Sequence, residues 1–276
     1  MSKLGEQIAL GSRSVVHAWG TDAVAKVPLA TTPEGWIRFE AGYADAVYHS
    51  GAPVPRVLGV EVIAGRDVSI FERIDGISMW DALMANDSEA RAFGRELGVA
   101  HAQLLMITPP VTLPSQYSRL TSKILTSSRE FDIPLLQVLE LVPRHVSRMA
   151  LCHGDFHPKN IMLSSRGLFI VDWFDASRGD GGADIARTSL LLSAQRHDTA
   201  QPRHLPGASL PVLDALHDSY LHTVRSHVGV SDAELSTWRF VQAAARLAEG
   251  VEIEPLLMLL KGLPEQTEGA VGVRST

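Results

Sequence analysis

The sequence predicts an α+β protein with two lobes, a small β-rich N-terminal lobe that contains one helix and a larger, mainly helical C-terminal lobe. Three observations support this fold class. β-prone segments surround a single amphipathic helix before residue 75, helical periodicity dominates after it, and the 276 residues suffice for two lobes. We place the lobes at residues 1–74 and 75–276, with a hinge at about residues 72–77.

The N-terminal lobe is predicted from β-prone segments on both sides of the helix. Residues 8–20 and 22–30 are short apolar segments separated by glycine-containing turns, which is typical of a β-hairpin. In the segment that begins at Pro33, aromatic and apolar residues recur at spacings of three and four, which predicts a helix. Residues 53–74 then predict two more strands around a glycine turn.

The C-terminal lobe is predicted from helical periodicity that one strand pair interrupts. The segment 108–119 carries three prolines and is expected to be a loop. Short strands are expected at 161–163 and 168–172, on either side of a turn. Helices are expected at 78–86, 88–107, within 134–149, and at 183–195, 209–228 and 232–249, before a polar tail that starts at Gly262.

Bulk composition limits the partners and the location of the protein. The net charge is −6 and the sequence pI is about 6.0, so no basic excess favours nucleic-acid binding. The single cysteine, Cys152, excludes a disulfide framework and fits a reducing compartment. The N-terminus is a poor signal peptide, and no window approaches ~18 uninterrupted apolar residues. We therefore expect a cytoplasmic protein that binds neither nucleic acid nor a membrane, and the sequence leaves its oligomeric state open.

The stretch LCHGDFHPKN concentrates polar side chains in a short loop between two apolar segments. Two interpretations compete. His153, Asp155 and His157 could form the zinc cluster of a metallohydrolase, which would need a further ligand nearby. Alternatively, Asp155 and Asn160 keep the spacing of a phosphoryl-transfer loop, in which a carboxylate lies beside the attacking hydroxyl and an amide helps to hold Mg²⁺.

A second acid completes the phosphoryl-transfer interpretation. Asp172 follows the apolar segment LFIV, and the turn at 164–167 lets the two flanking strands pair. This pairing would bring Asp172 back beside Asn160, where a metal-binding carboxylate is needed. A polar turn explains any one of these residues. It does not explain three oxygen ligands at these spacings, so we favour phosphoryl transfer.

The motifs HGDFHPKNIML and IVDWFDASRGDGGADIART resemble the aminoglycoside phosphotransferase and choline kinase family. This family has a two-lobe protein-kinase-like fold and phosphorylates small molecules. The resemblance covers about residues 5–255. It implies ATP, with GTP still open, and Mg²⁺ as cofactors, and a small-molecule alcohol as the substrate. It also implies that Asp155 orients the substrate hydroxyl and accepts its proton, and that Asn160 and Asp172 hold Mg²⁺.

The resemblance assigns further residues around the cofactor. It implies nucleotide contacts from a strand lysine, its helix glutamate partner, two turn hydroxyls and the hinge backbone, at Lys26, Glu40, Ser12, Ser14, Glu72 and Ile74. It implies that Asp184 braces the catalytic loop, and we expect His153 to hold the backbone of that loop. The loop GSRSVV departs from the kinase pattern G-x-G-x-x-G because it has only one glycine, and Trp-Phe follows Asp172 where protein kinases have Phe-Gly.

Substrate contacts are the least constrained part of the predicted site. Trp238 could line a pocket, and the acids Glu249 and Glu252 would suit a cationic substrate, although core packing and a solvated helix end explain them more simply. The first expectation is an antibiotic, aminoglycoside-like or otherwise sugar-containing. The alternatives are a kinase of a metabolite alcohol, such as choline, a sugar or an amino-acid alcohol, and a catalytically idle nucleotide-binding regulator of the same fold. The sequence does not identify the substrate or the hydroxyl that is phosphorylated.

Overall fold

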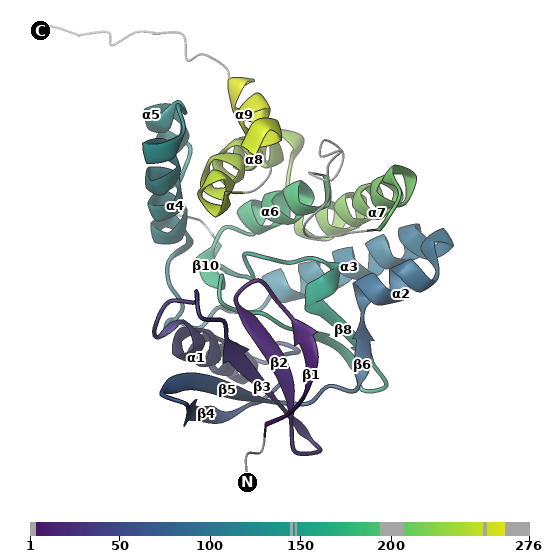
Figure 1. The fold of residues 1–276 in the computed structure, drawn as a ribbon. Coiled ribbons are helices and arrows are strands. Elements are labelled where there is room, and N and C mark those ends of the chain that lie inside the picture. Colours follow the sequence, from purple (N-terminus) through teal and green to yellow (C-terminus); the bar gives the residue numbers. More distant parts are fainter. Residues whose placement is uncertain (1–3, 144–145, 147, 194–206, 251–252, 263–276) are drawn as a thin grey trace, which may run out of the picture.

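A five-stranded antiparallel sheet and a group of helices form the two main parts of the protein (Figure 1). The structure is a computed structural model that describes residues 4–143, 146, 148–193, 207–250 and 253–262. In Figure 1 the sheet lies below, with α1 (Trp36–His49) against it, and the helices from α2 onward lie above.

The N-terminal sheet has the strand order β1-β2-β3-β5-β4, and neighbouring strands are antiparallel. Its strands are β1 (Leu4–Leu10), β2 (Ser14–Trp19), β3 (Ala23–Pro28), β4 (Val57–Ile63) and β5 (Arg66–Glu72). Alternate residues on β3 and β5 are buried and form a small apolar cluster of Ala23, Ala25, Val68 and Ile70. The predicted hairpin and the predicted strand pair are both present, as β2 paired with β3 and β4 paired with β5.

Helix α1 begins three residues later than the sequence predicts, at Trp36 instead of Pro33. Gly35 lies in the left-handed region with φ 78°, so the helical conformation does not extend back to Pro33. The helix turns an apolar face inward, and Glu40 is buried within that face at 2% exposure. A buried carboxylate requires a cationic or hydrogen-bonding partner.

The C-terminal part is mainly helical, with short strands between the helices. Its helices are α2 (Met79–Ala85), α3 (Ala90–Leu105), α4 (Gln116–Glu130), α5 (Leu135–Glu140), α6 (Gly181–Ser193), α7 (Leu210–Val228), α8 (Asp232–Arg246) and α9 (Ile253–Lys261). The 3₁₀ helices among the residues that the structure describes are η1 (Asp87–Glu89), η2 (Pro158–Asn160) and η4 (Leu247–Glu249). The short strands are β6 (Gly76–Ser78), β7 (Ala150–Cys152), β8 (Ile161–Ser164), β9 (Gly167–Ile170) and β10 (Ser177–Gly179).

Two of these helices were not predicted, and others differ in extent. The expected loop 108–119 ends early because α4 starts at Gln116, where the Ser115 hydroxyl caps the helix. The helix is mostly polar and its inward stripe is narrow, with Leu120 and Ile124 among the buried residues, so few apolar side chains mark it in the sequence. Helix α9 precedes the predicted tail, α5 fills only part of 134–149, and the expected helix 232–249 continues past α8 as the 3₁₀ helix η4.

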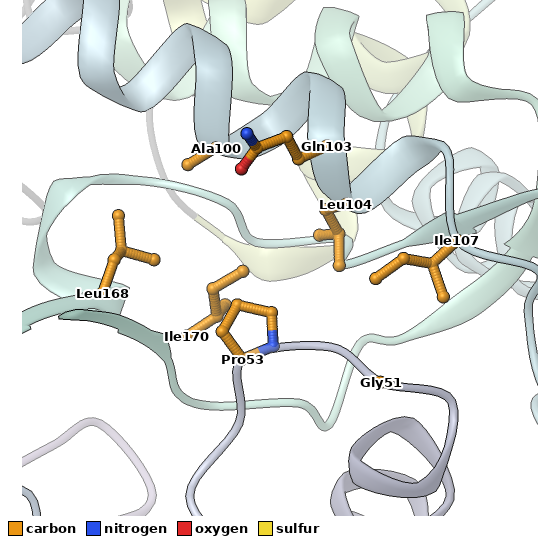
Figure 2. A pocket seen from close by; sticks show the side chains of 8 residues that line it. All are labelled: Gly51, Pro53, Ala100, Gln103, Leu104, Ile107, Leu168 and Ile170. Atoms are coloured by element: carbon orange, nitrogen blue, oxygen red, sulfur yellow. The ribbon is translucent and has the colours of Figure 1, made fainter. Parts of the chain in front are cut away.

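The two parts meet along β9 and the connection between α1 and β4. The N–H of Ile170 donates to the carbonyl oxygen of Pro53 at 2.7 Å. A pocket of about 360 Å³ lies beside this contact, between that connection, α3 and β9 (Figure 2). Leu104 and Ile170 are buried in its wall, and none of the charged residues discussed below lines it. The predicted lobe boundary at residues 72–77 stays a prediction.

Candidate active site

The loop between β7 and β8 carries the predicted catalytic carboxylate. Within this loop, η2 begins at Pro158, whose ring suits the first position of a helix. Gly154 has φ 79°, and a Cβ atom there would lie 2.4 Å from the carbonyl oxygen of Asp175. Only glycine fits this turn without a backbone shift, so the loop packs directly against the chain at Asp175.

Asp184, in the first turn of α6, binds the backbone of this loop. Its Oδ2 accepts a hydrogen bond from the N–H of His153 at 2.7 Å, and its Oδ1 accepts one from the N–H of Gly154 at 2.8 Å. The buried His101 contacts the same carboxylate at 3.1 Å. Burial acts to raise the pKa of Asp184, but His101 and His153 outweigh it and the pKa is lowered. An ionised, buried carboxylate thus ties two backbone N–H groups of the loop in place.

Both ring nitrogens of His153 form hydrogen bonds with backbone groups. Nδ1 accepts from the N–H of Asp155 at 3.2 Å, so Nε2 carries the proton and donates to the carbonyl oxygen of Val171 at 3.0 Å. Burial lowers the pKa of His153, which favours this neutral form.

The described residues contain no group of three or more His, Cys, Asp or Glu side chains suited to a metal ion. The zinc interpretation therefore has no support in the geometry of the described loop.

Asp155 is partly open to solvent, with 26% of its side chain exposed. Its Oδ2 lies 3.3 Å from Nε2 of His157, and its Oδ1 lies 3.3 Å from Nη2 of Arg187. Burial acts to raise the pKa of Asp155, but these two neighbours hold it well below its ordinary value. Asp155 is therefore an ionised carboxylate that a hydroxyl group can approach.

The paired strands β8 and β9 bring Asp172 back toward Asn160, as the spacing predicts. The N–H of Val171 donates to the carbonyl oxygen of Asn160 at 2.9 Å. The amide Nδ2 of Asn160 donates to the carbonyl oxygen of Asp155 at 2.9 Å, which leaves the amide oxygen available as a ligand. Asp172 has φ 68°, a left-handed conformation that is uncommon outside glycine, and 45% of its side chain is exposed.

Lys26 on β3 joins the two parts of the protein electrostatically. Its Nζ forms an ion pair with Glu40 of α1 and lies 3.1 Å from Oδ1 of Asp172. Burial acts to lower the pKa of Lys26, but the two carboxylates outweigh it and raise the pKa above its ordinary value. Burial raises the pKa of Glu40 to about 7, against the opposing charge of Lys26. The predicted Lys26–Glu40 pair is present, and the contact with Asp172 adds a third member.

The two hydroxyls predicted to contact the nucleotide phosphates belong to Ser12, in the turn after β1, and to Ser14, the first residue of β2. The N–H of Gly11 donates to the carbonyl oxygen of Ser14 at 2.8 Å and closes the turn. Ser12 is exposed, whereas Ser14 is buried at 3% exposure. Phosphate contacts from these two hydroxyls stay a prediction.

At the predicted hinge, the sheet already uses some of the backbone groups. The N–H of Glu72 donates to the carbonyl oxygen of Arg56, and the N–H of Arg73 donates to that of Asp22. The N–H of Ile74 has no acceptor among the described residues. The side chain of Glu72 forms an ion pair with Arg166, which keeps the pKa of this carboxyl below its ordinary value although burial opposes the shift. The N–H of Ile74 can therefore donate to a nucleotide base without the loss of a backbone hydrogen bond of the sheet.

The three predicted substrate residues have different surroundings. Trp238 is buried at 6% exposure on α8. Glu249, at the end of η4, is close to three cations of the chain: Arg187 at 2.9 Å, and Lys123 and Arg246 each at 3.3 Å. A cationic substrate would have to compete with these partners for Glu249. Glu252 lies outside the described residues.

Sequence reasoning missed two residues that touch the catalytic loop. His101, on α3, stacks on the ring of Phe156 in the loop and contacts Asp184 across 83 positions of sequence. Arg187, on α6, contacts Asp155 across 32 positions and is 5% exposed. The available signal for Arg187 was its position three residues after Asp184, because residues at this spacing share one helix face. For His101 the only signal was a polar side chain in a stretch of α3 that is otherwise apolar.

The oxygen atoms of Asn160 and Asp172 suit a hard divalent cation. Mg²⁺ prefers oxygen ligands and is commonly held by one or two protein carboxylates together with substrate phosphates and water. Here the amide of Asn160 is oriented by its bond to Asp155, and the carboxylate of Asp172 is exposed and has its pKa lowered by Lys26 although burial opposes the shift. The residues present therefore fit Mg²⁺ as part of a nucleotide complex.

The sequence comparison identifies one family. The model of the phosphotransferase enzyme family matches residues 5–216 of this chain. A search of curated proteins found no match. Among the described residues, no helix is both long enough and apolar enough to cross a bilayer.

Solved structures share the fold at low sequence identity. An aminoglycoside-3'-phosphotransferase of type VIII superposes with a TM-score of 0.62 at 16% identity, covering 89% of this chain and 94% of that chain. A choline/ethanolamine kinase family protein from Mesorhizobium loti gives a TM-score of 0.52 at 18% identity, with 95% and 85% covered. A thermostable mutant of aminoglycoside phosphotransferase APH(4)-Ia, in ternary complex with AMP-PNP and hygromycin B, gives 0.59 at 15% identity, with 94% and 90% covered. The predicted two-lobe protein-kinase-like fold is thereby confirmed.

Proposed function

Because the chain belongs to the phosphotransferase enzyme family, we propose that it transfers the γ-phosphate of ATP to a hydroxyl group of a small molecule. The main support is the contact of Lys26 with Asp172 across the two parts of the protein, at 3.1 Å, next to the loop that carries Asp155 and Asn160. Phosphoryl transfer requires a cation near the nucleotide phosphates, oxygen ligands for a metal and a carboxylate at the acceptor. These four side chains supply that set.

The nucleotide lies between the two lobes in this proposal. Lys26, oriented by Glu40, contacts the phosphates, and the turn with Ser12 and Ser14 covers them. The backbone between Glu72 and Ile74 receives the base, with the N–H of Ile74 as the donor. Because backbone contacts alone bind the base here, GTP remains an alternative to ATP.

Asn160 and Asp172 hold Mg²⁺ with the nucleotide in this proposal. When bound, the metal would supply positive charge against the negative charge that develops on the phosphate oxygens during transfer. The chain's own contribution is to orient the two ligands, through the bond of Asn160 to the Asp155 carbonyl and the ion pair of Asp172 with Lys26.

Asp155 acts on the acceptor. Its carboxylate accepts a hydrogen bond from the acceptor hydroxyl and aligns the oxygen for in-line attack on the γ-phosphorus. The new bond joins the acceptor oxygen to phosphorus, and the bond from phosphorus to the β–γ bridging oxygen breaks. The hydroxyl proton moves to Asp155, and ADP leaves. His153 and Asp184 take no part in these bond changes. Asp184 contacts the loop backbone and His101, and the His153 ring contacts the backbone of Asp155 and Val171.

The acceptor is the least defined part of the proposal. Our first candidate is an antibiotic, aminoglycoside-like or otherwise sugar-containing, because several solved structures of this fold are aminoglycoside phosphotransferases. A metabolite alcohol such as choline, a sugar or an amino-acid alcohol is the alternative, in line with the choline/ethanolamine kinase family neighbour. Trp238, Glu249 and Glu252 remain candidate acceptor contacts, and the cytoplasmic location remains a prediction from composition.

The decisive experiment measures ADP release from Mg·ATP across a panel of candidate alcohols. At least one acceptor is expected to raise the rate, and Asp155→Ala is expected to abolish the increase while melting like the wild type. The matched control is Asp87→Ala, which removes an exposed aspartate on η1. Full activity of Asp155→Ala would refute the assignment.

A second measurement separates the enzyme from an idle regulator and from a metallohydrolase. Thermal shift with ATP should be larger in the presence of Mg²⁺ than in its absence, because the metal and the nucleotide share Asn160 and Asp172 as their site. Metal-independent binding without turnover would favour the regulator. Stoichiometric zinc in the purified protein would favour the hydrolase.

A further inference from the structure

We propose that Arg187, itself held by Glu249, is a positioning residue that fixes the orientation of the Asp155 carboxylate for the acceptor hydroxyl. The inference rests on the proposed function, since it concerns how Asp155 meets its substrate. It starts from the place of Arg187 on α6, three residues after Asp184. Residues at this spacing face the same side of a helix, so the helix that braces the loop backbone also presents a cation to the loop's carboxylate.

The guanidinium of Arg187 contacts both the backbone and the side chain of the loop. Its Nε donates to the carbonyl oxygen of Gly154 at 3.1 Å, and its Nη2 donates to Oδ1 of Asp155 at 3.3 Å. The side chain of Arg187 is 6% exposed, so these contacts are made away from bulk water. A planar guanidinium offers several donors at fixed angles, which a lysine does not.

Glu249 fixes the other edge of the same guanidinium. Its Oε1 lies 2.9 Å from Nη1 of Arg187, and its Oε2 accepts from Nη2 at 3.0 Å, a two-point contact. Lys123 of α4 and Arg246 of α8 each lie 3.3 Å from Glu249, so the carboxylate is itself anchored from two helices. Arg187 therefore has little freedom to turn away from Asp155.

The two oxygens of Asp155 are consequently occupied on opposite sides. Oδ1 faces Arg187, and Oδ2 faces His157 at 3.3 Å. The carboxylate plane is set by these contacts, and its 26% exposed surface is what remains for the hydroxyl. Holding reacting groups in one orientation contributes strongly to rate, and a misplacement of about 1 Å costs up to ~100-fold.

This role predicts a separation of kinetic effects. Among the described residues, Arg187 makes no hydrogen bond or ion pair with Lys26, Asn160 or Asp172, which we assign to the nucleotide and the metal. Removing Arg187 should therefore lower kcat and leave the KM for ATP and the nucleotide-induced thermal shift unchanged. A merely structural role would lower the melting temperature and disturb both kinetic constants.

The test compares Arg187→Met, Arg187→Lys and Glu249→Gln in the full-length protein. ADP release from Mg·ATP is measured with water as the acceptor and with the best alcohol of the panel above. We expect kcat to fall roughly 10- to 100-fold in Arg187→Met and less in Glu249→Gln. Arg187→Lys keeps the positive charge but loses the planar guanidinium with its several donors, so it should recover only part of the rate. The control Arg225→Met removes an arginine that pairs with the exposed Asp232 and should leave kcat unchanged.

The double variant decides whether Glu249 acts through Arg187. If it does, Arg187→Met with Glu249→Gln should have the kcat of Arg187→Met alone, within about twofold, because the two residues act as one unit. Losses that multiply instead would show that Glu249 acts independently and would overturn the linked role. If Arg187→Met does not fold, a folded Arg187→Lys with wild-type kcat would overturn the inference equally.

The proposed function and this inference fail in different ways. A wild-type protein that binds Mg·ATP but releases no ADP with any acceptor refutes the function and the inference with it. A wild type that turns over, together with an inactive Asp155→Ala and a fully active Arg187→Met, refutes only the positioning role.

Discussion

Asp184→Ala is expected to destabilise the protein strongly through the loop that it braces. The substitution removes the acceptor for the N–H groups of His153 and Gly154, at 2.7 and 2.8 Å, and the partner of His101 at 3.1 Å. All of this happens in a site where the aspartate itself is 1% exposed. No water can take over these bonds without entering the core.

The magnitude follows from the groups left without partners. Each buried donor that loses its acceptor costs about 1–3 kcal/mol. Two backbone N–H groups lose their acceptor here, so we expect a loss of roughly 4 kcal/mol. For a chain of this size that lowers Tm by roughly 10 °C.

Urea and thermal unfolding followed by circular dichroism measure this loss. Asp184→Asn should be intermediate, because one amide oxygen still accepts while the amide N–H₂ meets the second backbone donor. Asp87→Ala, on the exposed η1, should stay within about 0.5 kcal/mol of the wild type. A loss below about 1 kcal/mol for Asp184→Ala would refute the reasoning, since it would mean that the two N–H groups find other acceptors.

The same aspartate predicts the direction of a pH effect. The folded protein holds the pKa of Asp184 below its ordinary value, with burial opposing His101 and His153. The stabilisation is therefore fully present above the ordinary aspartate range and is lost as pH falls through the lowered value. Asp184→Ala should flatten this part of the acid-unfolding curve, and an unchanged acid limb would contradict the assignment.

Two further outcomes test the loop and the network beside it. Gly154→Ala should lower both Tm and ADP release. The control Gly229→Ala has the same φ of 79° but open space at its Cβ, so it should cost only the backbone strain of about 1–3 kcal/mol. Equal losses of stability in the two variants would mean that the close contact of Gly154 with Asp175 is unimportant. The pKa of Glu249 is lowered to about 2, with burial opposing the charges of Arg187, Lys123 and Arg246. The ionised Glu249 carboxylate therefore stabilises the folded protein by roughly 3 kcal/mol at neutral pH. This contribution should be lost as pH falls from about 4.5 toward 2 and should be absent from Glu249→Gln. Identical acid unfolding of the wild type and the variant would count against it.

Much of the candidate site was predictable because its spacing is local. Asp155 and Asn160 are five residues apart on one loop, and a single tight turn between β8 and β9 returns Asp172 to them. A turn of fixed length leaves few alternatives, so residue spacing alone determines which side chains meet. Lys26 and Glu40 were also predictable, since an apolar strand with one lysine and an apolar helix face with one acid each need a partner.

The extent of α4 and η4 was less predictable, for a physical reason. Helix α4 is largely polar and packs a narrow stripe against α8, so few apolar side chains mark it in the sequence and packing supplies most of its stability. The sequence ending in Glu249 continues the pattern of α8, yet the chain tightens into a 3₁₀ turn there. Local preference at such ends is weak, and contacts with other elements decide the conformation.

The sequence by itself was enough to predict the reaction type, through the order and spacing of Asp155, Asn160 and Asp172 on adjoining local elements. The tertiary structure alone decided what surrounds them. Arg187 meets Glu249 across 62 positions, and His101 meets Asp184 across 83. Contacts at such separations depend on how whole helices pack, and the energy that selects a packing is spread over many apolar side chains. No short segment of the sequence therefore encodes them.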